Sequence, residues 1–164
     1  MFEVPIKFEF TPELQERFPN VIPDGKTYPS AEHIYQMFKS DHPEWKAMIR
    51  KTINPKKTKT MVRKYFKKGI LFETDRQFIL RPDWNEFKYE LMYAIVTLKF
   101  YQNENIGRKL CELEGYIEER NCCGDIYWGT VDGKGENNLG KILMLVRSRL
   151  RREFEIIDSS NRVI

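Results

Sequence analysis

The spacing of apolar residues predicts amphipathic helices along most of the chain. After Pro82, apolar residues recur at intervals of three and four as far as about residue 103, which is the period of one face of a long helix. Asp83 and Glu86 form a capping arrangement where this helix begins. Its apolar stripe consists of Trp84, Phe87, Leu91, Ile95 and Leu98. We expect this segment to be the central core helix.

A second long helix is predicted near the end of the sequence, where Asn137 or Asn138 is a suitable cap. Its apolar face consists of Leu139, Ile142, Leu143, Val146 and Leu150. Glycine and polar residues dominate residues 121–138 before it, a pattern typical of loops, and Asp132-Gly133 favours a tight turn.

Shorter elements are expected in the rest of the chain. Ser30 is a suitable cap for a helix whose apolar face includes Ile34 and Phe38. Further helices are predicted over residues 43–53, 55–66 and 105–113, and short strands within residues 2–10 and over residues 26–28. Together these elements predict an α+β fold, namely one predominantly helical domain over residues 1–164 with a few short strands.

Composition places the chain among globular proteins. Hydrophobic residues make up 41% of 164 residues, enough for one domain with a core, and most aromatic side chains are expected to fill that core. No signal peptide or membrane span is apparent. Cys111, Cys122 and Cys123 are odd in number and lack the spacing of a zinc site, so we expect reduced thiols, no metal site and a cytoplasmic location.

Positive charge is concentrated between Lys46 and Lys68. This segment has ten basic residues and no acidic residue, and because the whole chain carries +4, the remaining residues carry about −6. Such polarity favours an anionic partner, whereas many basic segments are only solvated helix faces. From the residues alone, the two interpretations are equally strong.

Glu32 is the first candidate for chemistry, because it lies two residues after the predicted cap Ser30. Backbone N–H groups and the helix dipole favour an ionised carboxylate in a first turn. An ionised carboxylate is suited to activating water, to acting as a nucleophile, or to stabilising a developing positive charge. A first-turn glutamate is more often only a partner of the helix dipole, so position alone favours the structural interpretation.

Polar residues continue from Glu32 along the same helix. Tyr35, Gln36 and Lys39 follow at helical spacing, so a polar stripe runs beside the apolar one. His33 has no evident metal or nucleophile partner in the sequence, and we interpret it as a hydrogen-bonded structural residue.

The second candidate is the segment from Asp125 to Gly129. Trp128 in a glycine-rich loop is suited to stacking on a nucleobase, and nearby glycines let the backbone approach a phosphate or sugar. Alternatively, Trp128 fills the core while Asp125 caps a turn. The two interpretations are balanced. The sequence has no phosphate-binding or dinucleotide-binding glycine motif, so no cofactor is expected.

Three blocks of sequence stand out when they are taken together. The first reads D-G-K-T-Y-P-S-A-E-H-I-Y-Q over residues 24–36. The second reads R-P-D-W at residues 81–84 and L-K-F-Y-Q-N at residues 98–103. The third reads D-I-Y-W-G at residues 125–129 and G-x-G-E-N-x-L-G-K-x-L-M-x-V-R at residues 133–147. In this order and spacing, over about residues 8–150, they resemble the NADAR (YbiA-like) family.

The resemblance implies an N-glycosidase that acts on a phosphorylated nucleoside-like or ADP-ribose-like small molecule. Examples are a phosphoribosylaminopyrimidine of riboflavin synthesis and ADP-ribosylated guanine, and ADP-ribosylated nucleic acid is a further candidate partner. The resemblance also implies that Glu32 is the catalytic carboxylate. The residues that match the other family elements are Asp125, Trp128 and Gly129, then Lys59 and Arg63, and then Gly135, Asn137 and Gly140.

The chemistry of such a reaction suggests a role for each residue. Cleavage of a ribosyl C–N bond builds positive charge on the sugar, which Glu32 would stabilise. Asp125 would assist the departing nitrogen if burial raises its proton affinity, and Trp128 would hold the base. Lys59 and Arg63 would bind phosphate. The other predicted substrate-binding residues are Tyr35, Gln36, Gly129 and Asn137.

The chain departs from the family pattern at three places. Gln15-Glu16-Arg17 stands where many members read S-N-F, and Val131 and Val62 each replace a usual glycine. The Gln15-Glu16-Arg17 departure motivates a second interpretation, a non-catalytic module that binds ADP-ribose, a nucleotide or nucleic acid through the basic segment from Lys46 to Lys68. The sequence leaves the oligomeric state open.

Overall fold

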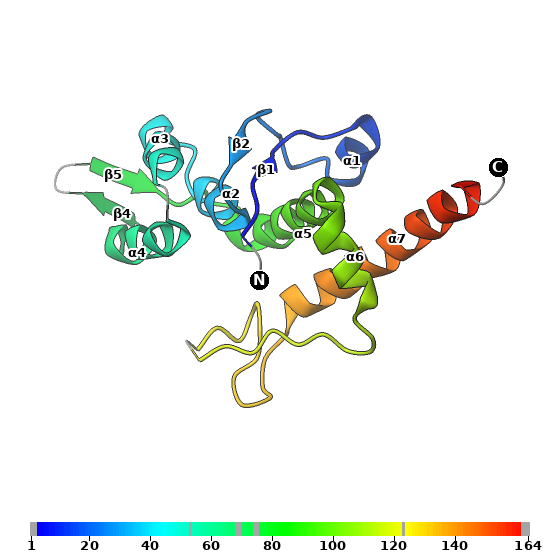
Figure 1. Cartoon of the computed structure of the whole chain (residues 1–164). Helices are drawn as coiled ribbons and strands as arrows, with labels where there is room; N and C mark the ends of the chain where they lie inside the picture. Colours follow the sequence, from blue (N-terminus) through cyan, green and yellow to red (C-terminus); the bar gives the residue numbers. More distant parts are fainter. Residues whose placement is uncertain (1–2, 53, 68–69, 74–75, 123, 162–164) are drawn as a thin grey trace. The chain divides into compact units, whose positions relative to one another are not determined.

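The computed structural model describes residues 3–52, 54–67, 70–73, 76–122 and 124–161, and between residues 62 and 77 it describes the backbone only. Arg63, a predicted phosphate ligand, therefore has its side chain outside the described part. The chain divides into two compact units, Met1–Lys99 and Phe100–Ile164, and each is described by itself (Figure 1).

The first unit begins with two short strands that enclose a helix. Strand β1 (Ile6–Lys7) pairs antiparallel with β2 (Thr27–Tyr28), which confirms both strands predicted near the N-terminus. Helix α1 (Pro12–Arg17) lies between them in the chain and was not predicted. Its signal was present in the sequence, because the Thr11 side chain accepts a hydrogen bond from the Leu14 N–H and proline follows the cap.

Aromatic rings fill the core of the first unit, as the composition predicted. Phe8 is fully buried and makes edge contacts with the rings of Phe10, Tyr28 and Phe38. Helix α5 (Trp84–Gln102) confirms the predicted core helix, and every residue of its predicted stripe is buried. Ala94, Val96 and Thr97 are buried too, so the helix is enclosed on more than the one predicted face.

Helix α2 (Ala31–Met37) is tied to α3 (Pro43–Lys51) through two buried side chains. The Trp45 indole donates a hydrogen bond of 2.9 Å to the Gln36 carbonyl oxygen. His33 Nε2 donates to the Thr52 carbonyl oxygen at 2.7 Å, because a carbonyl only accepts, and His33 Nδ1 bonds the Ser30 hydroxyl at 2.8 Å. The structural interpretation of His33 is confirmed.

The basic helix α4 (Pro55–Tyr65) leads into strands that the sequence analysis missed. Strands β3 (Phe66–Lys67), β4 (Ile70–Glu73) and β5 (Arg76–Ile79) form an antiparallel sheet, with Leu71 opposite Phe78. Figure 1 shows β4 and β5 beside α3 and α4. The missed signal was a pair of short apolar runs on either side of polar residues, which is a hairpin pattern.

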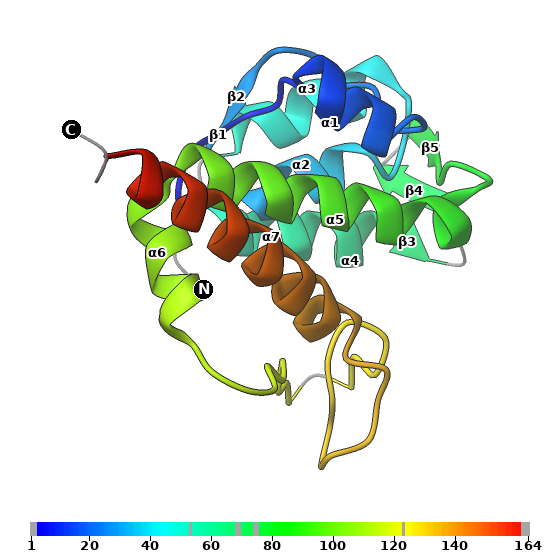
Figure 2. The ribbon, with the colours of Figure 1, turned by 90° about the vertical axis from the view of Figure 1, so that its right-hand side faces the viewer.

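The second unit consists of α6 (Glu104–Glu112), a long loop and α7 (Asn138–Asn161), and both helices were predicted. The two helices lie side by side (Figure 2). Two arginines of α7 satisfy carbonyl groups at the end of α6, where a helix leaves its last carbonyls unpaired. Arg147 donates to the carbonyls of Leu113 and Gly115, and Arg151 donates to that of Cys111.

The predominantly helical α+β class with a few short strands is confirmed. Among the described residues, no helix combines the length and the apolar character that crossing a membrane requires. The expectation that all 164 residues form a single domain stays a prediction, because the chain divides into two compact units.

Lys99, near the end of α5, generates a prediction about pH. Burial lowers the pKa of its ammonium from 10.5 to about 8, and the charge of Glu3 opposes this shift. The unfolded chain keeps the ordinary pKa, so between pH 8 and 10.5 it binds more protons than the folded chain. The contribution of Lys99 to the free energy of unfolding therefore rises through this window, by on the order of 2 kcal/mol.

Urea unfolding of the wild type and of Lys99→Met across that pH range measures this contribution as the difference between the two proteins. We expect the wild type to gain stability relative to the variant as the pH rises. A difference that stays constant would show that Lys99 keeps its ordinary pKa in the folded protein.

Candidate functional site

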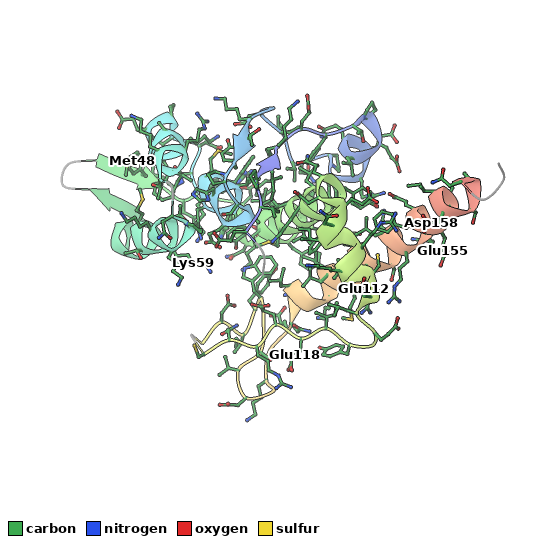
Figure 3. All side chains as sticks on the ribbon, viewed as in Figure 1. Met48, Lys59, Glu112, Glu118, Glu155 and Asp158 are labelled. Atoms are coloured by element: carbon green, nitrogen blue, oxygen red, sulfur yellow. The ribbon has the colours of Figure 1, made fainter. Side chains whose placement is uncertain are left out.

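Glu32 lies in the first turn of α2, where it contacts two polar side chains (Figure 3 labels Lys59, one of them). The Gln36 amide donates a hydrogen bond of 2.5 Å to Glu32 Oε1, and the Lys59 ammonium is 3.5 Å from Oε2. About a fifth of the Glu32 side chain is exposed, so the carboxylate is partly shielded but reachable. Three of the predicted site residues, from two helices, are therefore brought together.

Ser30 precedes α2 as predicted, but its hydroxyl does not cap the helix. No helix N–H donates to the Ser30 side chain, and its hydroxyl bonds His33 instead. This corrects the expected cap. The bond still fixes the first turn of α2, because His33 is buried and bonded at both ring nitrogens.

Gln36 has an unsatisfied group beside this carboxylate. Its amide nitrogen is committed to Glu32, and its amide oxygen is buried without a hydrogen-bond partner among the described residues. A buried acceptor without a partner costs about 1–3 kcal/mol, and such groups are uncommon in folded proteins. The group is therefore suited to accept a hydrogen bond from a ligand.

Tyr35 lies on the same side of α2 and is almost fully buried. Its ring packs against that of Trp84 with 5.0 Å between the centroids. The Lys39 ammonium is 5.5 Å from the centre of the Tyr35 ring and 5.6 Å from that of Trp84. The polar stripe predicted on this helix is present as the bonded pair Glu32 and Gln36, whereas Lys39 lies beyond the end of α2 at Met37.

The basic segment is described with side chains as far as Met61. Within that part, the basic residues that pair with acids are Lys46 with Asp41, Arg50 with Asp24 and Lys59 with Glu32. Lys51 at the end of α3 and Lys57 of α4 instead line a groove of about 460 Å³, together with Asn54 and Thr60. No acidic residue lines this groove, so it is suited to an anion.

In the second unit, Asp125 holds a turn. Its Oδ1 accepts hydrogen bonds from the N–H groups of Tyr127 and Trp128 at 3.1 and 2.9 Å. The Asn121 amide donates to the Asp125 carbonyl oxygen at 2.7 Å, a support that the sequence analysis missed. Asp125 is exposed, so the burial on which its predicted role as an acid depended is not present. The backbone carbonyls of this turn accept hydrogen bonds from the last helix.

Two of those carbonyls accept hydrogen bonds from the first N–H groups of the last helix. Trp128 is half-buried, its ring meets that of Tyr127 edge-on, and its carbonyl oxygen accepts from the Leu139 N–H in the first turn of α7. The Tyr127 carbonyl likewise accepts from the Asn138 N–H. The loop thus satisfies N–H groups that a helix leaves unpaired at its start. The capping role of the Asp125 segment is confirmed, while stacking of Trp128 on a base stays a prediction.

The glycines of this segment are required by close packing. A side chain at Gly129 would collide with the Glu119 carbonyl, and one at Gly135 would collide with the Gly129 carbonyl. One at Gly140 would collide with the Ile117 carbonyl and the Asn137 side chain. The tight turn predicted at residues 132–133 is confirmed, because both residues have positive φ and the flanking backbone groups bond each other.

Asn137 is buried at the centre of this packing. Its side-chain oxygen accepts from the Glu119 N–H, and its amide nitrogen donates to the Tyr116 hydroxyl and the Ile117 carbonyl. Both the oxygen and the nitrogen of this side-chain amide are therefore bonded to groups of the loop. Its predicted contact with substrate receives no support from this geometry.

The predicted site residues thus fall into two groups. Glu32, Gln36 and Lys59 meet in the first unit with Tyr35 beside them, and Asp125, Trp128, Gly129 and Asn137 meet in the second. Among the described residues there is no cluster of three or more histidine, cysteine or carboxylate side chains that could hold a metal ion.

One departure from the family pattern has a structural explanation. The Gln15 amide donates to the carbonyls of Phe18 and Val21, so it holds the turn after α1. Val131 bonds Lys134 through backbone groups at the tight turn, and nothing in the structure explains why valine replaces glycine there. The Val62 side chain lies outside the described part.

Comparison with known proteins agrees with this fold. The model of the NADAR domain matches residues 5–151, so the chain belongs to the NADAR family. The solved structure of the protein YbiA from Escherichia coli is similar, with a TM-score of 0.67 and 28% identity over 91% of this chain and 74% of that one.

Curated relatives include the N-glycosidase YbiA of Escherichia coli, 30% identical over 79% of this chain and 75% of the relative. A riboflavin biosynthesis protein of Vibrio vulnificus is 30% identical over 77% of this chain. A chloroplastic riboflavin biosynthesis protein of maize is 27% identical over the same share. The chain spans only about a third of the Vibrio protein and a fifth of the maize protein.

The close packing at Gly140 predicts that a glycine-to-alanine substitution in a helix lowers the stability of the protein. Alanine in place of glycine normally stabilises a helix by about 1 kcal/mol. Gly140→Ala should instead destabilise the protein by about 1–3 kcal/mol, because the added carbon meets the Ile117 carbonyl. Thermal unfolding measures the change. Gly124→Asn is the control, because Gly124 is in open space and asparagine tolerates its positive φ. A stabilised Gly140→Ala protein would contradict the packing.

The two hydrogen bonds to Asp125 can be tested without an activity. Asp125→Asn keeps the acceptor Oδ1, whereas Asp125→Ala removes it. We expect hydrogen exchange at the Tyr127 and Trp128 amides to stay slow in the first variant and to accelerate in the second, with a loss of about 1 kcal/mol. Equal exchange in both variants would show that the carboxylate does not hold the turn.

Proposed function

We propose that the protein is an N-glycosidase that hydrolyses the bond between a ribose and a base nitrogen. The observation that supports this most is the position of Glu32, a partly shielded carboxylate fixed by Gln36 and paired with Lys59. The names of the relatives agree, because YbiA is an N-glycosidase and others serve riboflavin biosynthesis.

The chemistry requires a negative group near the anomeric carbon. As the C–N bond breaks, its electron pair leaves with the base and the ribose becomes cationic. Glu32 stabilises this cation and orients the water that attacks it. The water oxygen forms the new bond to carbon, and a proton ends on the departing nitrogen. Lys59 keeps the carboxylate in place through its charge.

In the second unit, Trp128 is half-buried and is proposed to stack on a base. The space beside Gly129 is filled by the Glu119 carbonyl, so Gly129 serves the packing of the loop. Asp125 orients Trp128 through the turn rather than acting as a buried acid. Asn137 keeps the loop in shape.

The substrate is proposed to be phosphorylated, because the helix whose Lys59 reaches the Glu32 carboxylate is strongly basic. Lys59 and Arg63 belong to this helix, α4, and Lys57 of α4 lines a groove together with Lys51 at the end of α3. An ADP-ribosylated guanine and a phosphoribosylaminopyrimidine both satisfy this requirement. They differ in the base and in the group attached to the first phosphate.

Replacement of Glu32 by glutamine tests the proposed reaction. The amide is nearly the same size but carries no charge, so stabilisation of the cation is lost while binding is kept. We expect kcat to fall about 100–1000-fold for release of free base from ADP-ribosylated guanosine or from the phosphoribosylaminopyrimidine. Chromatography of the released base measures the rate.

Glu86→Gln is the matched control, because Glu86 is also a first-turn glutamate but is exposed. It should leave turnover unchanged. Full activity of a folded Glu32→Gln protein would refute the role of Glu32. If the wild type binds both compounds and releases base from neither, the protein is the non-catalytic binding module.

A further inference from the structure

We propose that the groove lined by the end of α3 and by α4 is a second binding site, which takes the phosphate monoester of a small molecule. Among the described residues that line this groove, neither Glu32 nor Gln36 is present, so it is separate from the candidate active site. The inference goes beyond the proposed function, because binding in the groove requires no hydrolysis. It assigns a ligand to the part of the basic segment that forms no ion pairs.

The groove and Glu32 lie on different sides of α4. Lys57, Thr60 and Met61 line the groove at spacings of three and four residues, so they share one face of this helix. Lys59, whose ammonium is 3.5 Å from the Glu32 carboxylate, follows Lys57 by two residues, which is about 200° around a helix. A ligand in the groove therefore does not meet the carboxylate, and α4 separates the two sites.

The side chains that are free to bind a ligand in the groove are N–H donors. Lys51 and Lys57 are exposed, and neither forms an ion pair with any residue that the structure describes. The side-chain oxygen of Asn54 accepts from the Lys56 N–H at the start of α4. This leaves the Asn54 amide nitrogen without a partner in the described part of the chain. A matching ligand must therefore offer acceptors.

The other side chains of the groove are neutral. The Thr60 hydroxyl donates to the Lys56 carbonyl oxygen, and the Thr52 hydroxyl donates to the Met48 carbonyl oxygen. The Met61 side chain is half-buried and adds apolar surface beside the two ammonium groups. Thioether groups make favourable contacts with aromatic rings. The groove thus fits a ligand whose anionic group is attached to an apolar or aromatic body.

Charge favours a phosphate monoester over a carboxylate as the anionic group. Lys51 and Lys57 supply two positive charges, and no described acidic residue lines the groove. A cleft lined by one sign of charge concentrates counter-ions. A phosphate monoester carries a charge of about −1.5 to −2 at neutral pH and offers three acceptor oxygens, whereas a carboxylate carries a single charge. Lysine binds phosphate as a point charge.

The size of the groove favours a small molecule over a nucleic acid. Its volume of about 460 Å³ is typical of small-molecule sites, which measure roughly 300–1,000 Å³. A nucleic acid backbone is bound by several cations along an extended surface. Such a row is interrupted here, because Arg50 pairs with Asp24 and Lys59 pairs with Glu32.

A titration with phenyl phosphate, followed by NMR of the isotope-labelled full chain, tests the site. This probe joins a phosphate monoester to an apolar ring. We expect saturable shifts of the backbone N–H signals of Asn54, Lys57 and Thr60. Lys57→Gln and Lys51→Gln should each weaken this binding about tenfold, because each removes one of the two charges that hold the phosphate.

Lys59→Gln is the matched control, because Lys59 is an exposed lysine of the same helix on its other side. It removes the same charge and should change the affinity of the groove by less than about twofold, since solvent and salt screen exposed charges. Equal weakening by Lys57→Gln and Lys59→Gln would overturn the site, because the general charge of the segment would then attract the anion. Shifts of the wild-type signals that do not saturate would overturn it even if a variant does not fold.

Two further probes test the class of ligand. Phenyl sulfate has the same shape but carries a single charge, so it should bind about tenfold more weakly than phenyl phosphate. Equal binding of the two would overturn the assignment to a phosphate monoester. A single-stranded oligonucleotide without terminal phosphates offers only diesters. If it bound the groove more tightly than phenyl phosphate and with steep salt dependence, the small-molecule assignment would be wrong. These measurements stay informative whether or not the protein hydrolyses an N-glycosidic bond.

Discussion

The first unit depends on the buried imidazole of His33. Both of its ring nitrogens are bonded, one to Ser30 before α2 and the other to Thr52 after α3. A buried polar group is costly if one of its hydrogen bonds is missing. The two bonds of His33 therefore favour the one arrangement of α2 and α3 in which both are made. Glu32 precedes His33 directly, and its direction follows from that arrangement. The catalytic geometry proposed here is thus a consequence of a structural histidine.

The second unit is held together by a different constraint, which is the close approach of backbone to backbone. The carbonyls of Tyr127 and Trp128 satisfy the start of α7, and the glycines near them leave no room for a side chain. The family pattern W-G followed by G-x-N-x-L-G is explained by this packing. In the described part of the chain, the side chain of Asn137, which the pattern suggested as a ligand, bonds groups of the loop alone. A residue that marks a family therefore need not touch the substrate.

The basic segment of the first unit contains both paired and unpaired roles for its charges, because some of its cations form ion pairs and others line a groove. Arg50 pairs with Asp24 and Lys59 with Glu32, which are distant in the sequence, and Lys46 pairs with the nearby Asp41. A count of charges cannot reveal these pairs. The basic segment is therefore neither a uniform solvated face nor a uniform anion site. Part of it is bound up in the fold, and Lys51 and Lys57 remain for a groove.

Apolar spacing determined the long helices α5 and α7, the short helices α2, α3, α4 and α6, and the loop with its tight turn, because these depend on neighbours within a few residues. Composition likewise determined that aromatic rings fill the core. The three-stranded sheet was missed because short strands gain their stability from pairing rather than from local preference. Only the tertiary structure placed Lys59 against Glu32, left the Gln36 oxygen unpaired, exposed Asp125 and set Lys39 over two rings. These features arise from contacts between elements. The environment of a side chain is decided by the residues that pack against it, and the order of residues along one helix does not specify those residues.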